Sequence, residues 1–382
     1  MDFSLNEERQ AISDMALRFA QEELAPHAAE WDEQKHFPVD VIKKTAELGL
    51  AAIYTREDVG GSNLGRLDAA LVFEALSEGC VSTAAYISIH NMCCWMIDRF
   101  GSEQLRQKYC PSLSSMSLLA SYCLTEPGSG SDAAALRTKA VRDGDNYILN
   151  GSKAFISGAG VSDVYVVMVR TGDEGPKGIS TVIVEKGTPG LTFGANERKM
   201  GWNSQPTAIV TFEDCRIPLT NRIGEEGEGF TFAMQGLDGG RVNIAACSLG
   251  AANAALKAAL AYTDERRAFG GALSNLQAIQ FKLADMATEL EAARSLLYKA
   301  AWKLDAKAPD ATRFCAMAKR FVTDAGFNIV NEALQIHGGY GYLRDYPLER
   351  MLRDVRVHQI LEGTNEIMRM IVARDLLKEN RA

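Results

Sequence analysis

The sequence has few of the residue patterns that bind metals or carry redox chemistry. Its 382 residues include only five histidines, and none lies at the H-E-x-x-H spacing of a helical zinc site. Eight cysteines are scattered along the chain without a C-x-x-C pair. The sequence therefore predicts no metal site, and it predicts reduced thiols of the kind found in a cytosol-like compartment.

Positive charge and long apolar runs are also scarce. The chain has 41 Lys and Arg against 49 Asp and Glu, and this net charge of −8 argues against nucleic acid as a partner. We identify no stretch of about 18 uncharged apolar residues, so no membrane span is expected. The start, MDFSLNEERQ, has neither a signal-peptide pattern nor an Arg-rich transit pattern. We expect a cytoplasmic protein, or a mitochondrial-matrix protein if a transit peptide was removed.

Hydrophobic periodicity divides the chain into three zones. Residues 1–120 show helical spacing. Residues 121–225 contain short β-branched runs such as VYVVMVR, separated by turn-forming residues, and they predict a small barrel or sandwich rather than a parallel βαβ sheet. Residues 226–382 are helical again and predict a four-helix bundle. The expected fold class is α+β, mostly α, with three domains at these boundaries.

The clearest helical signal is a series of apolar residues that alternate steps of three and four: Leu276, Ile279, Leu283, Met286, Leu290, Ala293 and Leu297. This spacing predicts a buried bundle seam, and Ser274 or Asn275 is expected to cap the start of the helix. Three further helices should follow, with breaks near Pro309, within HGGYGY (337–342) and near Gly363. Bundles of this kind often associate, so an oligomer is expected.

The stretch HQILEGTNEIMR, residues 358–369, places one acid in apolar surroundings. Glu362 follows Ile360 and Leu361 and precedes Gly363. A carboxylate in an apolar environment without a neutralising cation has a raised pKa, which makes it a better general base near neutral pH. The alternative is an exposed glutamate at a helix end, which is the commoner situation.

Three other motifs have two interpretations each, and a fourth has one. SYCLTEPGSGSD (121–132) is either a Gly-rich loop for a phosphate or polar ring or an ordinary turn. HGGYGY permits the close approach of a flat ligand or simply ends a helix. DERRAFG (264–270) offers arginines to a diphosphate or to the helix dipole. RDVR (353–356) is interpreted as the charged, solvent-facing side of a helix.

Together, in this order, these motifs resemble the acyl-CoA dehydrogenase family over essentially the whole chain. The resemblance is carried by YCLTEPGSGSD, RRAFG, QIHGGYGY and ILEGTNE. The stretches AYISIHNMCCWMIDRFG (85–101), LNGSKAFISGAG (149–160) and GWNSQPT (201–207) are similar to the members that act on short branched acyl groups. The resemblance implies an FAD-dependent α,β-dehydrogenation, with isobutyryl-CoA of valine breakdown as the expected substrate.

Other activities are weighed against this one. 2-Methylbutyryl-CoA and butyryl-CoA are alternative substrates, because one methylene changes binding by only about 1–3 kcal/mol. An acyl-CoA oxidase is less favoured because such oxidases are usually longer. A non-catalytic, nucleic-acid-associated relative is opposed by the negative charge and by the presence of Glu362.

The resemblance also implies a mechanism. Glu362 would remove the α-proton while the flavin N5 accepts the β-hydride, and its backbone N–H would donate to the thioester carbonyl. Some members carry their base immediately before the arginine that is here Arg241, but that position is Gly240, so Glu362 is the only candidate in either location. Phe155 replaces a tryptophan of medium-chain members. Electrons are expected to pass to an electron-transfer flavoprotein.

The resemblance assigns three sets of binding residues. The flavin is expected at Tyr122, Leu124, Thr125, Gly130, Ser131, Phe155, Ile156, Ser157, Thr364, Asn365 and Glu366. The FAD diphosphate and adenosine are expected at Arg266, Phe269, Leu276, Gln277, Gln335, His337, Gly338 and Gly339. The acyl-CoA is expected at Ser131, Asp238, Gly239, Gly240, Arg241 and Arg374. In the family the first two sets come from different subunits, which implies that oligomerisation completes the site, and the family's habit of forming tetramers implies a homotetramer.

Overall fold

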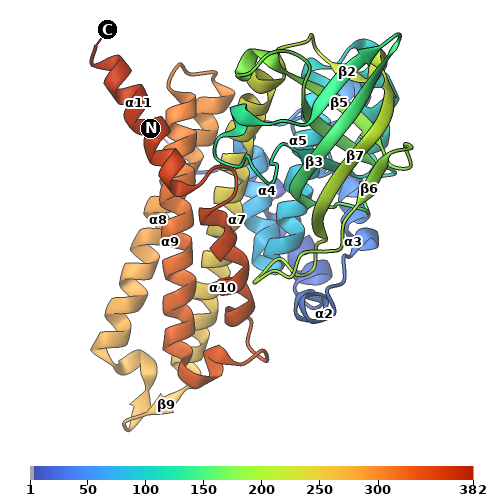
Figure 1. Ribbon diagram of the computed structural model, residues 1–382. Coiled ribbons are helices and arrows are strands. Elements are labelled where there is room, and N and C mark those ends of the chain that lie inside the picture. Colours follow the sequence, from blue (N-terminus) through green and yellow to red (C-terminus); the bar gives the residue numbers. More distant parts are fainter. Residues whose placement is uncertain (1–3, 382) are drawn as a thin grey trace.

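Helices form the two ends of the chain and strands form its middle (Figure 1). The computed structural model describes residues 4–381. The expectation of no targeting segment rests partly on residues 1–3, which lie outside this range. The N-terminal helices are α1 (Glu7–Phe19), which continues into a π-helical turn (Ala20–Leu24), then α2 (Ala28–Gln34), α3 (Val39–Lys44), α4 (Arg66–Gly79), α5 (Val81–Phe100) and α6 (Glu103–Ser114). Almost every residue of α4 and α5 is buried, so these two helices form the centre of the molecule.

The middle zone is an eight-stranded sheet in which most neighbours are antiparallel. Its strands are β1 (Ala120–Cys123), β2 (Lys139–Asp143), β3 (Asn146–Ser157), β4 (Val164–Arg170), β5 (Ile179–Glu185), β6 (Leu191–Phe193), β7 (Thr207–Pro218) and β8 (Arg222–Ile223). The order is β6-β7-β3-β2-β4-β5-β8, with β1 parallel to β4. The predicted small β domain without interleaved helices is confirmed.

The C-terminal zone is a helical bundle, as its spacing predicts. It contains α7 (Gly229–Glu265), a hairpin of β9 (Arg267–Ala268) and β10 (Gly271–Ala272), α8 (Gln277–Asp305), α9 (Ala311–His337), α10 (Leu348–Arg356) and α11 (Asn365–Glu379). The expected seam is buried at Met286, Leu290, Ala293 and Leu297.

The predicted cap of α8 is wrong. Ser274 and Asn275 lie in a 3₁₀ turn (Leu273–Asn275), and the helix begins after Leu276 with no side-chain cap. The Ser274 carbonyl instead accepts a hydrogen bond from the Gln280 side chain at 2.9 Å. The 3₁₀ turn thus bonds to the first turn of α8 through the Ser274 backbone carbonyl and not through the side chain of Ser274 or Asn275.

α7 is long and apolar enough to cross a membrane by length and composition, although no such segment was expected from the sequence. However, 67% of its most apolar window is buried inside the protein. α7 packs against α9, α4 and α5, and its small residues permit close approach: a Cβ at Gly250 would lie 2.0 Å from the Glu74 carbonyl oxygen. Its apolar character is that of a core helix surrounded by other helices.

The β domain is joined to the bundle at α10. A Cβ at Gly201 would lie 2.4 Å from the Arg353 carbonyl oxygen, and the Trp202 N–H donates to Asp354 Oδ1 at 2.6 Å. The interpretation of RDVR as a solvent-facing surface is therefore wrong for Asp354, which is only 2% exposed. Burial raises the pKa of this carboxyl to about 6. The Arg353 guanidinium bonds to Asp32 Oδ2 at 2.6 Å, so this helix connects domains rather than facing water.

Candidate active site

Glu362 lies in the loop that joins a 3₁₀ turn (Val357–Gln359) to α11. Its backbone φ is +55° and that of Gly363 is +87°, so two consecutive residues are left-handed. This conformation is unfavourable for a glutamate and is adopted easily only by glycine. The Thr364 hydroxyl then caps α11 by accepting the Ile367 N–H at 3.3 Å. The loop therefore reverses the chain within a few residues and turns the Glu362 side chain toward α7.

α7 presents a glycine to the Glu362 carboxylate. A Cβ added at Gly240 would lie 2.3 Å from Glu362 Oε2 and 2.8 Å from its Cδ, far inside van der Waals contact. The absence of a side chain at Gly240 thus provides the space that the carboxylate occupies. The two positions at which family members carry their base, here Gly240 and Glu362, therefore lie beside each other in the fold. A side chain at position 240 would occupy the space of the Glu362 carboxylate.

The Glu362 carboxylate is held without a direct partner. Its Oε2 is buried and accepts no hydrogen bond from any residue between 4 and 381. Burial raises its pKa to about 7, although the positive charges of Arg241 and Lys319 act in the opposite direction. The predicted direction of the shift is confirmed, and its cause is burial within the chain. A carboxylate that titrates near neutral pH is suited to accept a proton there.

Arg241 joins α7 to the Glu362 loop. Its Nε donates to the Glu362 carbonyl oxygen at 3.4 Å and its Nη1 donates to Asp238 Oδ1 at 2.6 Å. The Thr312 hydroxyl donates to the other Asp238 oxygen at 2.6 Å. Two of the expected substrate residues, Gly240 and Arg241, therefore contact Glu362, and a third, Asp238, holds the Arg241 guanidinium in place.

A second group of expected residues lies at the edge of the β domain. The loop between β1 and β2 is fixed by Glu126, which accepts the backbone N–H groups of Arg137 and Thr138 and the ammonium of Lys153. Lys153 is fully buried and also donates to the Leu124 carbonyl at 3.0 Å. The rigid part of SYCLTEPGSGSD is thus held by a buried ion pair.

The exposed part of this loop is open. A Cβ at Gly128 or Gly130 would meet nothing in the chain within 4 Å, so packing within residues 4–381 does not require glycine there. β3 is joined to this loop by the Ala154 N–H, which donates to the Thr125 carbonyl at 2.8 Å. The next residue, Phe155, is 68% exposed and has a φ of +59°, at a register shift between β3 and β7. A bulky aromatic residue in this conformation is an outlier, and such outliers concentrate at ligand sites.

Tyr122 of β1 lies near enough to Glu362 for the charge of the carboxylate to act on its phenol. Its hydroxyl is buried and has no hydrogen-bond partner among the described residues. Burial raises the Tyr122 pKa strongly, and the charge of Glu362 adds to this effect, so the phenol stays protonated. An unpaired phenol and an unpaired carboxylate oxygen near one another indicate a polar space that is shaped for a ligand.

A third group lies at the far end of the bundle, beside the β9 hairpin (Figure 1). A pocket of about 370 Å³ is lined there by Tyr262, Arg266, Leu273, Ile336, His337, Gly338, Gly339, Tyr340 and Leu343. The Tyr262 and His337 rings stack at 4.1 Å, and the Arg266 guanidinium lies 5.6 Å from the Tyr340 ring. Phe269, in the hairpin, is 92% exposed. The predicted diphosphate residues Arg266, His337, Gly338 and Gly339 therefore meet in one pocket.

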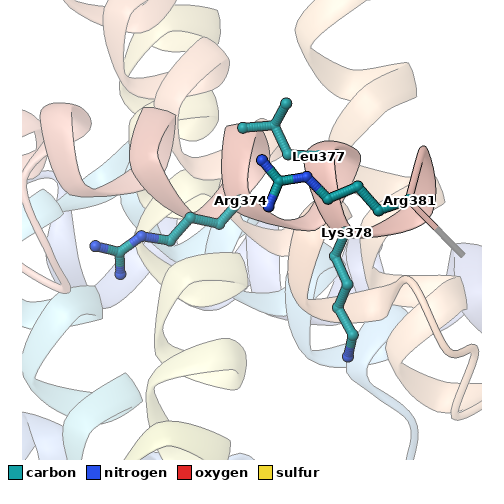
Figure 2. A pocket seen from close by; sticks show the side chains of 4 residues that line it. All are labelled: Arg374, Leu377, Lys378 and Arg381. Atoms are coloured by element: carbon teal, nitrogen blue, oxygen red, sulfur yellow. The ribbon is translucent and has the colours of Figure 1, made fainter.

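Arg374 is placed away from the loop. It is exposed on α11 and lines a shallow groove of about 460 Å³ with Leu377, Lys378 and Arg381. Figure 2 shows the Arg374 and Lys378 side chains pointing in different directions from the helix. Within the described residues, Arg374 therefore lies beside basic residues at the end of the chain, Lys378 and Arg381, and not beside Glu362.

The chain matches known proteins over nearly its whole length. Residues 6–117, 121–215 and 227–377 match the N-terminal, middle and C-terminal domains of acyl-CoA dehydrogenase. The isobutyryl-CoA dehydrogenase of Bos taurus is 59% identical over 98% of this chain and 90% of its own length. The chain belongs to the acyl-CoA dehydrogenase family.

Two further relatives support the assignment of this chain to the family. The isobutyryl-CoA dehydrogenase of Dictyostelium discoideum is 58% identical over 98% of this chain and 91% of its own length. The butyryl-CoA dehydrogenase structure from Megasphaera elsdenii superimposes with a TM-score of 0.96 at 40% identity and covers 99% of this chain and 100% of its own. The order of helical, β and helical zones is therefore the family fold.

Two buried basic residues beside the expected site residues were not predicted from the sequence. Lys319 is buried on α9 and bonds the loop directly after Glu362. Arg66 is 8% exposed, lies 3.6 Å from the Tyr54 ring, and occupies the space where a side chain at Gly239 would be. The sequence could have indicated that Lys319 is buried, because it lies between Cys315 and Val322 on an apolar helix face. No such pattern surrounds Arg66, which follows a loop glycine.

Proposed function

We propose that this enzyme dehydrogenates isobutyryl-CoA to methacrylyl-CoA in valine catabolism, with Glu362 as the base. The observation that carries the proposal is a buried Glu362 oxygen without a partner, opposite Gly240, on a carboxyl whose pKa lies at about 7. The two relatives of 58–59% identity, both named isobutyryl-CoA dehydrogenase, support the substrate. Butyryl-CoA and 2-methylbutyryl-CoA are the alternatives, and the Megasphaera relative favours the first of these at lower identity.

The residues suit the removal of an α-proton from a thioester. An ionised Glu362 accepts the proton, a role that typically contributes 10²–10⁴-fold to rate. The Glu362 backbone N–H has no acceptor among residues 4–381 and is available to the thioester carbonyl. A donor of this kind stabilises the developing enolate by about 3–4 kcal/mol. Arg241 fixes the same residue through its carbonyl, so base and donor are positioned together.

The residues also fit FAD. An exposed Phe155 at positive φ, an open Gly128–Gly130 loop and a pocket beside Arg266 match the ring and diphosphate of a flavin nucleotide. When bound, FAD supplies the two-electron acceptor that takes the β-hydrogen as hydride. We assign the flavin ring to Tyr122, Leu124, Thr125, Gly130, Ser131, Phe155, Ile156 and Ser157, and the phosphate side of the flavin to Thr364 and Glu366. The diphosphate and adenosine are assigned to Arg266, Phe269, Leu276, Gln277, Gln335, His337, Gly338 and Gly339. Asn365 is buried behind the loop, so its contribution is to hold Thr364 and Glu366 in place.

Assembly follows from the separation of these two sets. Arg266 directly precedes β9 and Phe155 lies on β3, and Figure 1 shows these two strands far apart in the molecule. A single FAD can use both sets only if a second copy provides one of them. We therefore propose a homotetramer in which subunits complete each other's sites, with Asp238, Gly239, Arg241 and Arg374 for the CoA portion. An electron-transfer flavoprotein would reoxidise the enzyme in the cytoplasm or the mitochondrial matrix.

Anaerobic mixing of the purified holoenzyme with isobutyryl-CoA, 2-methylbutyryl-CoA and butyryl-CoA tests the proposal. Flavin bleaching should be fastest with isobutyryl-CoA. Faster bleaching with another thioester would keep the reaction and change the substrate. The Glu362→Gln variant should retain FAD and lose nearly all bleaching, because its amide cannot accept the proton. A Gln variant with more than about a tenth of the wild-type rate would exclude Glu362 as the base.

A further inference from the structure

A buried lysine holds the base-bearing loop from behind. Lys319 on α9 is 0% exposed, and its Nζ donates to the Gly363 carbonyl at 2.7 Å and to Asn365 Oδ1 at 2.8 Å. Gly363 directly follows Glu362, and Asn365 is the first residue of α11. The ammonium thus ties the end of the turn, in which Glu362 and Gly363 take their left-handed conformations, to the first residue of α11.

Lys319 has no ion-pair partner within residues 4–381. Both of its hydrogen-bond acceptors are neutral oxygens. The acid near this network, Asp324, is bonded instead to the Asn365 amide at 2.7 Å and to the Gln359 amide at 2.8 Å. A buried cation without a counterion is unfavourable. Its presence indicates that the positive charge acts on a group in the site.

Glu362 is that group. The Lys319 charge lowers the pKa of Glu362, and Glu362 in turn raises that of Lys319, against the burial that lowers the lysine to about 7. Other charged or titratable groups also face the pair: Arg241 of α7, Tyr122 of β1, Cys93 of α5, His358 of the 3₁₀ turn, Asp324 of α9 and Glu366 of α11. Burial keeps Tyr122, Cys93 and His358 uncharged near neutral pH.

We propose that Lys319 is a positioning residue for the dehydrogenation, whose ammonium fixes the Glu362 turn and favours the ionised carboxylate. The inference rests on the proposed role of Glu362 as the base. It gives Lys319 two effects that can be separated by experiment. Fixing the turn affects the rate at every pH, whereas the charge affects the pH at which the base becomes active.

The test is the pH profile of kcat/KM for the FAD-loaded Lys319→Met enzyme. Removal of a nearby positive charge should move the acid limb upward by about one pH unit, so that activity at pH 6 falls about tenfold more than at pH 8.5. Lys319→Arg keeps the charge and should keep a limb near that of the wild type. Lys257→Met is a matched control, because Lys257 is an exposed lysine paired with Glu78.

Asn365→Asp provides a second variant of nearly unchanged size. It places a carboxylate where Lys319 now bonds a neutral oxygen at 2.8 Å, and it also puts a second negative charge beside Asp324, which the Asn365 amide now bonds at 2.7 Å. Both changes offset the Lys319 charge and should shift the limb upward. If both variants fold, hold FAD and keep the wild-type limb, with or without a uniform loss of rate, the charge role of Lys319 is refuted. Turnover by Glu362→Gln, or a wild-type profile without an acid limb, would refute the base assignment itself and is read independently of the lysine variants.

Discussion

Replacement of Glu362 by glutamine should stabilise the fold while it abolishes turnover. The folded chain holds this carboxyl at a pKa of about 7, against an ordinary value of 4.5. Because one pKa unit corresponds to about 1.4 kcal/mol, ionised Glu362 costs the folded state about 3 kcal/mol at high pH. A neutral amide of the same shape avoids this cost. The gain is an upper value, since the amide also leaves buried polar atoms without partners.

The sign of the effect depends on pH in a defined way. Below pH 4.5 both folded and unfolded chains keep the proton, so Glu362 carries no ionisation cost. Between pH 4.5 and 7 the unfolded chain releases the proton first, and the stability of the wild type falls relative to the variant as pH rises. Above pH 7 the difference is constant. The advantage of Glu362→Gln should therefore grow through this window and then level.

Thermal unfolding of wild-type and variant holoenzymes with equal flavin content, from pH 5 to pH 8.5, measures this difference. Glu289→Gln is the matched control, because the same change falls on an exposed carboxylate of α8 that lies outside the proposed site. It should give no gain in Tm that grows with pH. A Tm difference for Glu362→Gln that is equal at pH 5 and pH 8.5 would refute burial as the source of the raised pKa.

Three other substitutions test separate parts of the site. Gly240→Ala adds a carbon 2.3 Å from Glu362 Oε2 and should lower kcat at least about tenfold with FAD retained; unchanged kcat would show that the carboxylate acts from another position. Lys153→Met leaves Glu126 buried without its cation and should reduce stability by about 3–5 kcal/mol in denaturant titrations, whereas a loss below about 1 kcal/mol would contradict a buried pair. Arg266→Ala should reduce both flavin content and the fraction of intact oligomer on size-exclusion chromatography, and full occupancy in an intact oligomer would remove it from the diphosphate site.

The sequence predicted the parts of the fold that depend on local periodicity. The seam through Met286, Leu290 and Leu297 is buried, and the helix breaks fall at the turn after His337 and at Gly363 as expected. These features repeat every three or four residues or follow from glycine, so a short window contains them.

Features set by contacts between distant segments were not predicted. Asp354 belongs to a charged run, yet Trp202 of the β domain buries it. The cap expected from Ser274 or Asn275 is absent, since a 3₁₀ turn precedes α8. The local sequence is the same whether or not the β domain packs against α10, so its charge pattern could not show the burial.

Glu362 illustrates both cases. Its apolar neighbours in sequence suggest a raised pKa, but they also fit an exposed glutamate at a helix end, and nothing within the local stretch decides between these. The decision comes from Gly240 and Lys319, which lie on two other helices. Gly240 admits the carboxylate to a buried position, which raises its pKa, and Lys319 opposes that rise. The pKa of Glu362 is thus set by burial, which raises it, against positive charge, which lowers it. Neither Gly240 nor Lys319 shows this role in the sequence of its own helix.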